Sequence, residues 1–269
     1  MNAATLPHHA DIGIGRITVR LHSDSREFLD TLGDRYAGFL TPANSPDFEF
    51  DVHLQPPEGI SPDADVSVFR NGQRWCLERG DFRAEWDPST RRGWIRQSPN
   101  PYSLDSVLRI VHTLILAREG GMLMHSSSAV RNGRAYLFSG VSGAGKTTMA
   151  RLAPPDVHVL TDEMSYVSRE ADGYYAYGTP FAGDLARPGE NLRAPLTAIY
   201  LLRQGPENRI EDLSPADAVR GLMANILFFA HDPELVQAVF AAAIDLAERV
   251  PVRRLTFLPD ARVWELIGN

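Results

Sequence analysis

The chain has 269 residues, 43% of them hydrophobic and 23% charged, which is an ordinary composition for a globular protein with a sizeable core. Its net charge of -7 and its scattered basic residues argue against binding that is driven by nucleic-acid phosphates. A single cysteine, Cys76, excludes an intrachain disulfide framework and a cysteine-based zinc cluster. We therefore expect a protein of a reducing, cytoplasmic setting that has no nucleic-acid partner.

Neither a secretion signal nor a membrane span is expected. Charged residues interrupt the N-terminal segment, including Asp11, Arg16 and Arg20, so it lacks the apolar core of a signal peptide. The apolar stretch at residues 107–117 contains Arg109 and is too short to cross a bilayer. We interpret that stretch as a packed helix.

The first hundred residues predict a small α+β unit, which we place at residues 1–101. Alternating apolar residues predict strands at 12–21 and 48–54, and helical spacing predicts a helix at 24–39 between them. A meander follows, in which turn dipeptides separate short strand-like runs at residues 66–70, 74–79 and 82–86.

The remaining residues, 102–269, predict an α/β domain. A helix at 103–117 leads into two strands, 122–130 and 134–138, that flank a strong Asn-Gly hairpin signal. The later elements, in chain order, are a short helix at 147–152, a strand at 157–160, a hairpin at 164–177, a strand at 197–202, helices at 215–229 and 233–249, a strand at 252–257 and a terminal helix from residue 259.

A phosphate-binding pattern lies where the second hairpin strand meets the short helix. The sequence matches G-x-x-x-x-G-K-[ST], the Walker A pattern of P-loop proteins, in full. Glycines let successive backbone N–H groups point at phosphate oxygens, and the N-terminus of the helix adds positive charge. The pattern predicts that ATP and Mg²⁺ bind here, on Gly140, Val141, Ser142, Gly143, Ala144, Gly145, Lys146, Thr147 and Thr148.

Lys146 is the only lysine in the chain, and the other 26 of its 27 lysine and arginine residues are arginines. An ammonium is a compact point charge on a flexible stem, whereas a guanidinium is a planar fork. A closed phosphate loop suits the ammonium. We therefore expect Lys146 to reach the β- and γ-phosphates and Thr147 to offer its hydroxyl to Mg²⁺.

Two acidic residues, Asp162 and Glu163, follow the next strand, and we expect them beside the γ-phosphate. One carboxylate in this place can hold Mg²⁺ while the other accepts the proton of an attacking hydroxyl. The alternative is a charged pair in a surface loop. His125 lies on the strand before the hairpin turn, where it is either a structural histidine or a group that contacts phosphate.

These residues together resemble a known family. The order His125-Ser-Ser-Ser-Ala, Asn-Gly hairpin, glycine loop, strand, Asp162-Glu163 resembles the catalytic domain of HPr kinase/phosphorylase. Its shorter relatives include kinases that phosphorylate a serine on a biosynthetic peptide. Phosphoenolpyruvate carboxykinase shares the fold and has a similar loop. The resemblance covers residues 121–181 well and the rest of the C-terminal half loosely.

The resemblance implies an HPr-kinase-like P-loop fold and ATP- and Mg²⁺-dependent phosphoryl transfer to a serine of a peptide or protein. It assigns the role of base and metal partner to Asp162 and a phosphate contact to His125. The catalytic set is then Asp162, Lys146, His125 and Glu163, and the metal ligands are Thr147, Asp162 and Glu163.

The sequence departs from the family in two places. The family usually has two aspartates where this chain has Asp162-Glu163, and the Glu-Ile-Arg-Gly-Leu-Gly signature is absent from the comparable segment, residues 178–191. HPr recognition and the reverse reaction are therefore not implied. Two alternatives stay open, a small-molecule kinase and a nucleotide-binding scaffold without phosphotransfer. The oligomeric state, a homo-oligomer included, is also open.

Overall fold

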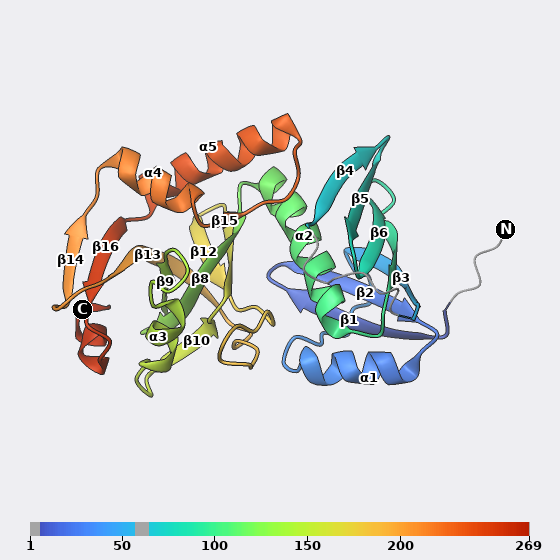
Figure 1. Ribbon diagram of the computed structural model, residues 1–269, viewed down its shortest axis with the longest axis horizontal. Coiled ribbons are helices and arrows are strands. Elements are labelled where there is room, and N and C mark those ends of the chain that lie inside the picture. The colour runs from blue at the N-terminus through green and yellow to red at the C-terminus, as the bar shows by residue number, and fades with distance from the viewer. Residues whose placement is uncertain (1–5, 57–64, 269) are drawn as a thin grey trace. The chain divides into compact units, whose positions relative to one another are not determined.

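The computed structural model describes residues 6–56 and 65–268 (Figure 1). Contacts divide the chain into two compact units. The first takes the chain up to His112 together with Phe229–Asp232, and the second takes Thr113–Phe228 with the chain from Pro233 on. The predicted boundary, between residues 101 and 102, lies at the start of the helix α2 (Pro101–Glu119), whereas the contacts divide the chain in the middle of this helix.

Unit 1 is built on a mixed sheet in the order β1-β2-β3-β7-β6-β5-β4. The helix α1 (Arg26–Arg35) connects β2 to β3, which are parallel neighbours. Ser25 caps this helix by accepting a hydrogen bond from the Phe28 amide at 3.2 Å. The strands are β1 (His8–Ile14), β2 (Ile17–Ser23), β3 (Phe48–Leu54), β4 (Ser67–Asn71), β5 (Arg74–Arg79), β6 (Phe82–Asp87) and β7 (Arg92–Gln97).

Two features of unit 1 differ from the sequence prediction. The run at residues 12–21 is two strands, because the chain reverses at Gly15, whose φ is 64°, and the apolar alternation changes phase across this turn. The strand β7 was not predicted, since its middle contains Gly93 and two arginines flank its apolar residues. Nevertheless β7 lies between β3 and β6 in the sheet.

Gly93 lets β7 pack closely against its two neighbouring strands. A Cβ atom at this position would lie 2.4 Å from the Glu85 carbonyl oxygen and 2.5 Å from Cε1 of the buried Phe50 ring. Both neighbours belong to the adjacent strands, so neither can move without disturbing the sheet. The residue is therefore required by packing.

We expect Gly93→Ala to destabilise the protein by about 1–3 kcal/mol, because the added methyl group overpacks the sheet. Gly33→Ala is the matched control. Gly33 lies in α1 with nothing within 4 Å of its would-be Cβ, so the change should stabilise the helix by about 0.5–1 kcal/mol. Thermal and denaturant unfolding of both variants measure the difference. Equal stability of the two variants would contradict this packing.

Unit 2 contains the elements that flank the glycine loop. The strands are β8 (Met122–Arg131), β9 (Arg134–Ser139), β10 (Val157–Thr161), β11 (Met164–Glu170), β12 (Gly173–Tyr177), β13 (Arg193–Gln204), β14 (Arg209–Asp212), β15 (Ile226–Leu227) and β16 (Val252–Phe257). The helices are α3 (Lys146–Arg151), α4 (Pro215–Met223) and α5 (Pro233–Arg249), with a 3₁₀ helix at Ala261–Leu266. The terminal helix was predicted, but β14 and β15 were not.

The strand β8 is shared by two groups of strands. Its C-terminal half pairs with β9 and β10, and its N-terminal half pairs with β11 and β15. On its other side β9 pairs in parallel with β13, which in turn pairs in parallel with β16. The strand that enters the glycine loop is therefore an interior strand with neighbours on both sides.

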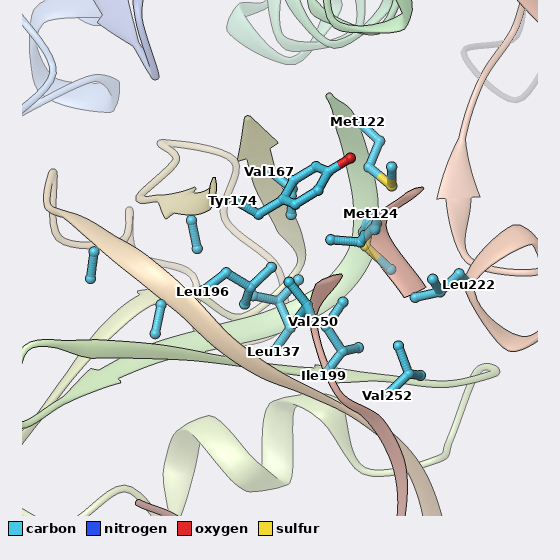
Figure 2. Close-up of a cluster of buried hydrophobic side chains, with 14 of the residues drawn as sticks. Met122, Met124, Leu137, Val167, Tyr174, Leu196, Ile199, Leu222, Val250 and Val252 are labelled. Carbon is cyan, nitrogen blue, oxygen red and sulfur yellow. The ribbon is translucent and has the colours of Figure 1, made fainter. Parts of the chain in front are cut away.

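The core of unit 2 lies on both faces of this sheet. On one face the strand residues Leu137, Ile199 and Val252 pack with Leu222 of α4 and Leu246 of α5, and Figure 2 shows part of this cluster. On the other face a second cluster joins the sheet to α3 and to the 3₁₀ helix, through Phe138, Tyr200, Phe257, Met149 and Trp264. No helix within residues 6–56 and 65–268 is long and apolar enough to span a membrane.

Candidate functional site

The glycine loop connects β9 to α3 and has a backbone that only glycine adopts readily at two positions. Gly143 has a φ of 77° and Gly145 a φ of 111°. A Cβ atom on Gly145 would also lie 2.4 Å from Cζ of Phe257. The loop closes with a turn in which the Ala144 amide donates to the Val141 carbonyl at 3.0 Å. The loop is thus already curled around its own centre.

Lys146 begins α3 and turns its side chain back into the loop. Its Nζ donates to the carbonyl oxygens of Gly140 at 2.9 Å and Val141 at 3.3 Å, and the residue is only 7% exposed. Burial lowers the pKa of this ammonium, and the nearby carboxylates of Glu163 and Asp184 act in the opposite direction. The unique lysine therefore lies inside the loop, within the electrostatic reach of two acids.

Two side chains hold the loop from neighbouring strands. Ser127, buried in β8, donates its hydroxyl to the Lys146 carbonyl at 2.8 Å. Gln204, the last residue of β13, donates its amide to the Gly143 carbonyl at 2.7 Å. Neither role was predicted from the sequence, because both contacts join residues far apart in the chain. The run of serines in β8 was the one local feature that pointed to either contact.

The chain passes from β10 to β11 at Asp162 and Glu163. Both strands pair with the same side of β8 and together form one long antiparallel partner of that strand, with the two acids between them. The Ser126 amide donates to the Glu163 carbonyl at 3.2 Å. This register places the acids opposite the residues of β8 that support Lys146.

Asp162 is buried and uses both of its carboxylate oxygens. Oδ1 accepts a hydrogen bond from the Gly183 amide at 2.9 Å, and Oδ2 accepts one from the Leu185 amide at 2.8 Å. A Cβ on Gly183 would lie 2.9 Å from Oδ2, so glycine permits the close approach. Asp162, which we predicted to be a base and metal ligand, thus holds the segment at residues 183–185.

Glu163 faces a different group. Its Oε1 lies 3.6 Å from Nε2 of His125, and both side chains are partly exposed. Glu163, Lys146 and His125 are therefore the predicted residues that the structure brings together at the loop, whereas the Asp162 carboxylate is directed into the segment beside it. Thr147, also predicted as a metal ligand, is partly exposed in the first turn of α3.

The described parts of the chain contain no cluster of three or more histidine, cysteine or acidic side chains that could hold a metal ion by themselves. Mg²⁺ at nucleotide sites usually uses one or two carboxylates together with phosphate oxygens and water. Glu163 and Thr147 offer donor atoms of the kind that such a site requires.

We expect Asp162→Asn to loosen the segment at residues 183–185, because an amide has one acceptor oxygen where the carboxylate has two. The loss of one buried charge-assisted hydrogen bond should cost about 1–3 kcal/mol. Amide hydrogen exchange should accelerate at Gly183 and Leu185. Asp184→Asn, which removes an exposed neighbouring charge, is the control. Unchanged exchange at both amides in Asp162→Asn would refute the structural role.

One known family matches the chain. The family model described as SynChlorMet cassette protein ScmC matches residues 100–269, a region that contains every predicted site residue from His125 to Glu163. No curated protein matches the chain.

These findings correct two predictions. The resemblance to HPr kinase/phosphorylase is wrong, because the matching family is ScmC. The function inferred from that resemblance, a kinase that phosphorylates serine on a peptide or protein, is wrong as well. The prediction failed because a glycine loop indicates phosphate binding by the backbone and does not specify the reaction. Proteins that share such a loop have many activities. A serine-bearing acceptor stays a prediction that no comparison tests.

Because the family model matches more than half of the sequence, the chain belongs to the ScmC family.

Proposed function

We propose that the chain binds a nucleoside triphosphate, ATP, together with Mg²⁺ at residues 140–148. The observation that carries this proposal is the ammonium of Lys146, which lies inside a loop curled by two left-handed glycines. Within the described residues its hydrogen-bond partners are two neutral carbonyl oxygens. A buried ammonium whose hydrogen-bond acceptors are neutral carbonyl oxygens gains from a directly bound anionic partner.

The backbone around Lys146 supports phosphate binding in a second way. The first N–H groups of α3 have no acceptor within the helix, and their partial positive charge favours an anion. The Ser127 hydroxyl fixes the Lys146 carbonyl, so this turn does not need to reorganise when a ligand binds. A preorganised loop avoids part of the entropic cost of binding.

The residues present fit Mg²⁺ as the companion of the phosphates. Glu163 supplies a carboxylate near the loop and Thr147 a hydroxyl at the start of α3. Mg²⁺ would neutralise charge between phosphate oxygens when bound. His125 lies beside this carboxylate, with its Nε2 3.6 Å from Oε1 of Glu163.

Lys146→Ala should weaken the binding of Mg-ATP by about tenfold or more, because a charge-assisted hydrogen bond to phosphate contributes about 1.5–3 kcal/mol. Isothermal titration calorimetry and thermal-shift measurements detect the change. Arg134→Ala is the control, since it removes one positive charge from an exposed residue at the start of β9. Equal affinity of Lys146→Ala and the wild-type chain for Mg-ATP would rule out this site.

A further inference from the structure

A cleft of about 450 Å³ lies in unit 2 beside α3. Its floor is one face of the edge strand β10. One wall is the end of α3 with the Pro154-Pro155 turn that follows, and the other wall is the segment at residues 185–190. Neither the proposed nucleotide loop nor the family match assigns a role to this cleft. Its volume is within the range of small-molecule sites.

The floor of the cleft is apolar and incompletely covered. Val157 and Val159 point to the same face of β10 because side chains alternate along a strand. Val157 joins the core beneath α3, but Val159 is only partly buried although it lies in the middle of the strand. An apolar side chain left open on a sheet face gains free energy when a ligand covers it.

The second wall is fixed close to the strand. The Glu190 amide donates to the Val159 carbonyl at 3.0 Å, and the Gly189 amide donates to the Thr179 carbonyl at 3.0 Å. A Cβ on Gly189 would lie 1.6 Å from the Leu160 carbonyl oxygen, so this segment lies directly against β10. The wall therefore keeps its position without help from a ligand.

An arginine stands on each wall, Arg151 at the end of α3 and Arg187 opposite. In the part of the chain that the structure describes, neither guanidinium has a carboxylate partner within 4.0 Å, whereas Arg131 nearby pairs with Asp156 at 2.9 Å. Two exposed arginines without acidic partners thus line one cleft. Guanidinium groups bind carboxylate and phosphate groups in a bidentate manner.

The acids of the cleft do not neutralise these arginines. Glu190 directs its carboxylate to Nδ1 of His158 at 2.8 Å, and His158 points to the face of β10 opposite Val157 and Val159. Asp162, at the end of the cleft, has both oxygens bound by backbone amides. Neither acid forms an ion pair with Arg151 or Arg187, so both guanidinium groups are available to a ligand.

The backbone that carries Arg187 is held in an uncommon conformation. Ala186 has a φ of 52°, in the left-handed region that residues other than glycine seldom adopt. Its amide donates to the Gly183 carbonyl at 2.9 Å, and Asp162 holds the amides on either side of Asp184. Such conformations persist where the surroundings determine them, and they concentrate at binding sites. Here the constrained turn sets the position of Arg187.

We propose that this cleft is a second binding site, which takes a small organic anion. The carboxylate or phosphate group of the ligand pairs with the guanidinium groups of Arg151 and Arg187, and its apolar body covers Val157 and Val159. The site is separate from the nucleotide loop and does not depend on the function proposed for it.

The test uses fluorine NMR on the full chain with three probes of one size: 4-fluorophenyl phosphate, 4-fluorophenylacetate and the neutral 4-fluorobenzyl alcohol. At least one of the two anions should bind, about tenfold or more tightly than the alcohol. Arg151→Gln and Arg187→Gln should each weaken that binding by about tenfold, with unchanged melting temperatures. Arg134→Gln, the control on an exposed arginine elsewhere, should bind like the wild type. The anion that binds more tightly identifies the group that the site prefers.

Lys146→Ala separates the cleft from the nucleotide loop, because it removes the loop's ammonium and leaves the cleft intact. The preferred anion should bind this variant as it binds the wild type. Loss of binding in Lys146→Ala, equal binding of the alcohol, wild-type affinity in either cleft variant, or binding of neither anion would each overturn the proposal.

Discussion

The strand β8 determines where every group of the candidate site lies, because two sets of strands share it. Its C-terminal half holds β9, from which the glycine loop emerges, and its whole length holds the successive strands β10 and β11 on the other side. The acids at the junction of β10 and β11 are therefore opposite the centre of β8. From that centre Ser127 supports the carbonyl of Lys146 at 2.8 Å. The lysine and the acids are thus connected through one strand, β8, which contacts both.

The two acids at this junction make different contacts, although both side chains pass close to Gly183. Asp162 points into the segment at residues 183–185 and accepts two amide hydrogen bonds there. Glu163 points toward His125 and acts on the pKa of Lys146. The Asp162 carboxylate, with both oxygens hydrogen-bonded, fixes the position of the backbone at residues 183–185. The Glu163 carboxylate is partly exposed and is accessible to a ligand. Asp162 therefore holds the wall of the neighbouring cleft.

Much of the fold could be predicted from the sequence, because strong local signals mark it. The apolar alternation and the bounding turns gave β3, β5 and β16 with the bounds that the structure has, and helical spacing gave α5. The signals failed where local pattern and tertiary packing disagree. Gly93 makes β7 a poor strand by composition, yet the sheet on either side requires that glycine. The break at Gly15 was missed although the apolar alternation changes phase there, which is a local sign of the turn.

The candidate site also contains residues that a local pattern predicts and residues that only the fold brings together. The loop and its lysine are contiguous in sequence, so the pattern located them and indicated phosphate. The supports from Ser127 and Gln204 and the arginines on the two walls of the cleft come together only through the sheet. The difference between Asp162 and Glu163 depends on their tertiary partners, which no local pattern specifies. The motif is local, so it carried no information on any second substrate of the protein. The inferred serine kinase was wrong.

The central claim is that the loop at residues 140–148 holds the phosphates of a nucleotide through its backbone amides. Amide hydrogen exchange of the full chain, followed by NMR without ligand, with Mg-ATP and with adenosine, tests this claim most directly. The account predicts that Mg-ATP slows exchange at Gly143, Gly145 and Lys146, because their N–H groups acquire phosphate acceptors, and that adenosine leaves these amides unchanged. Unchanged exchange at all three amides with saturating Mg-ATP would contradict it.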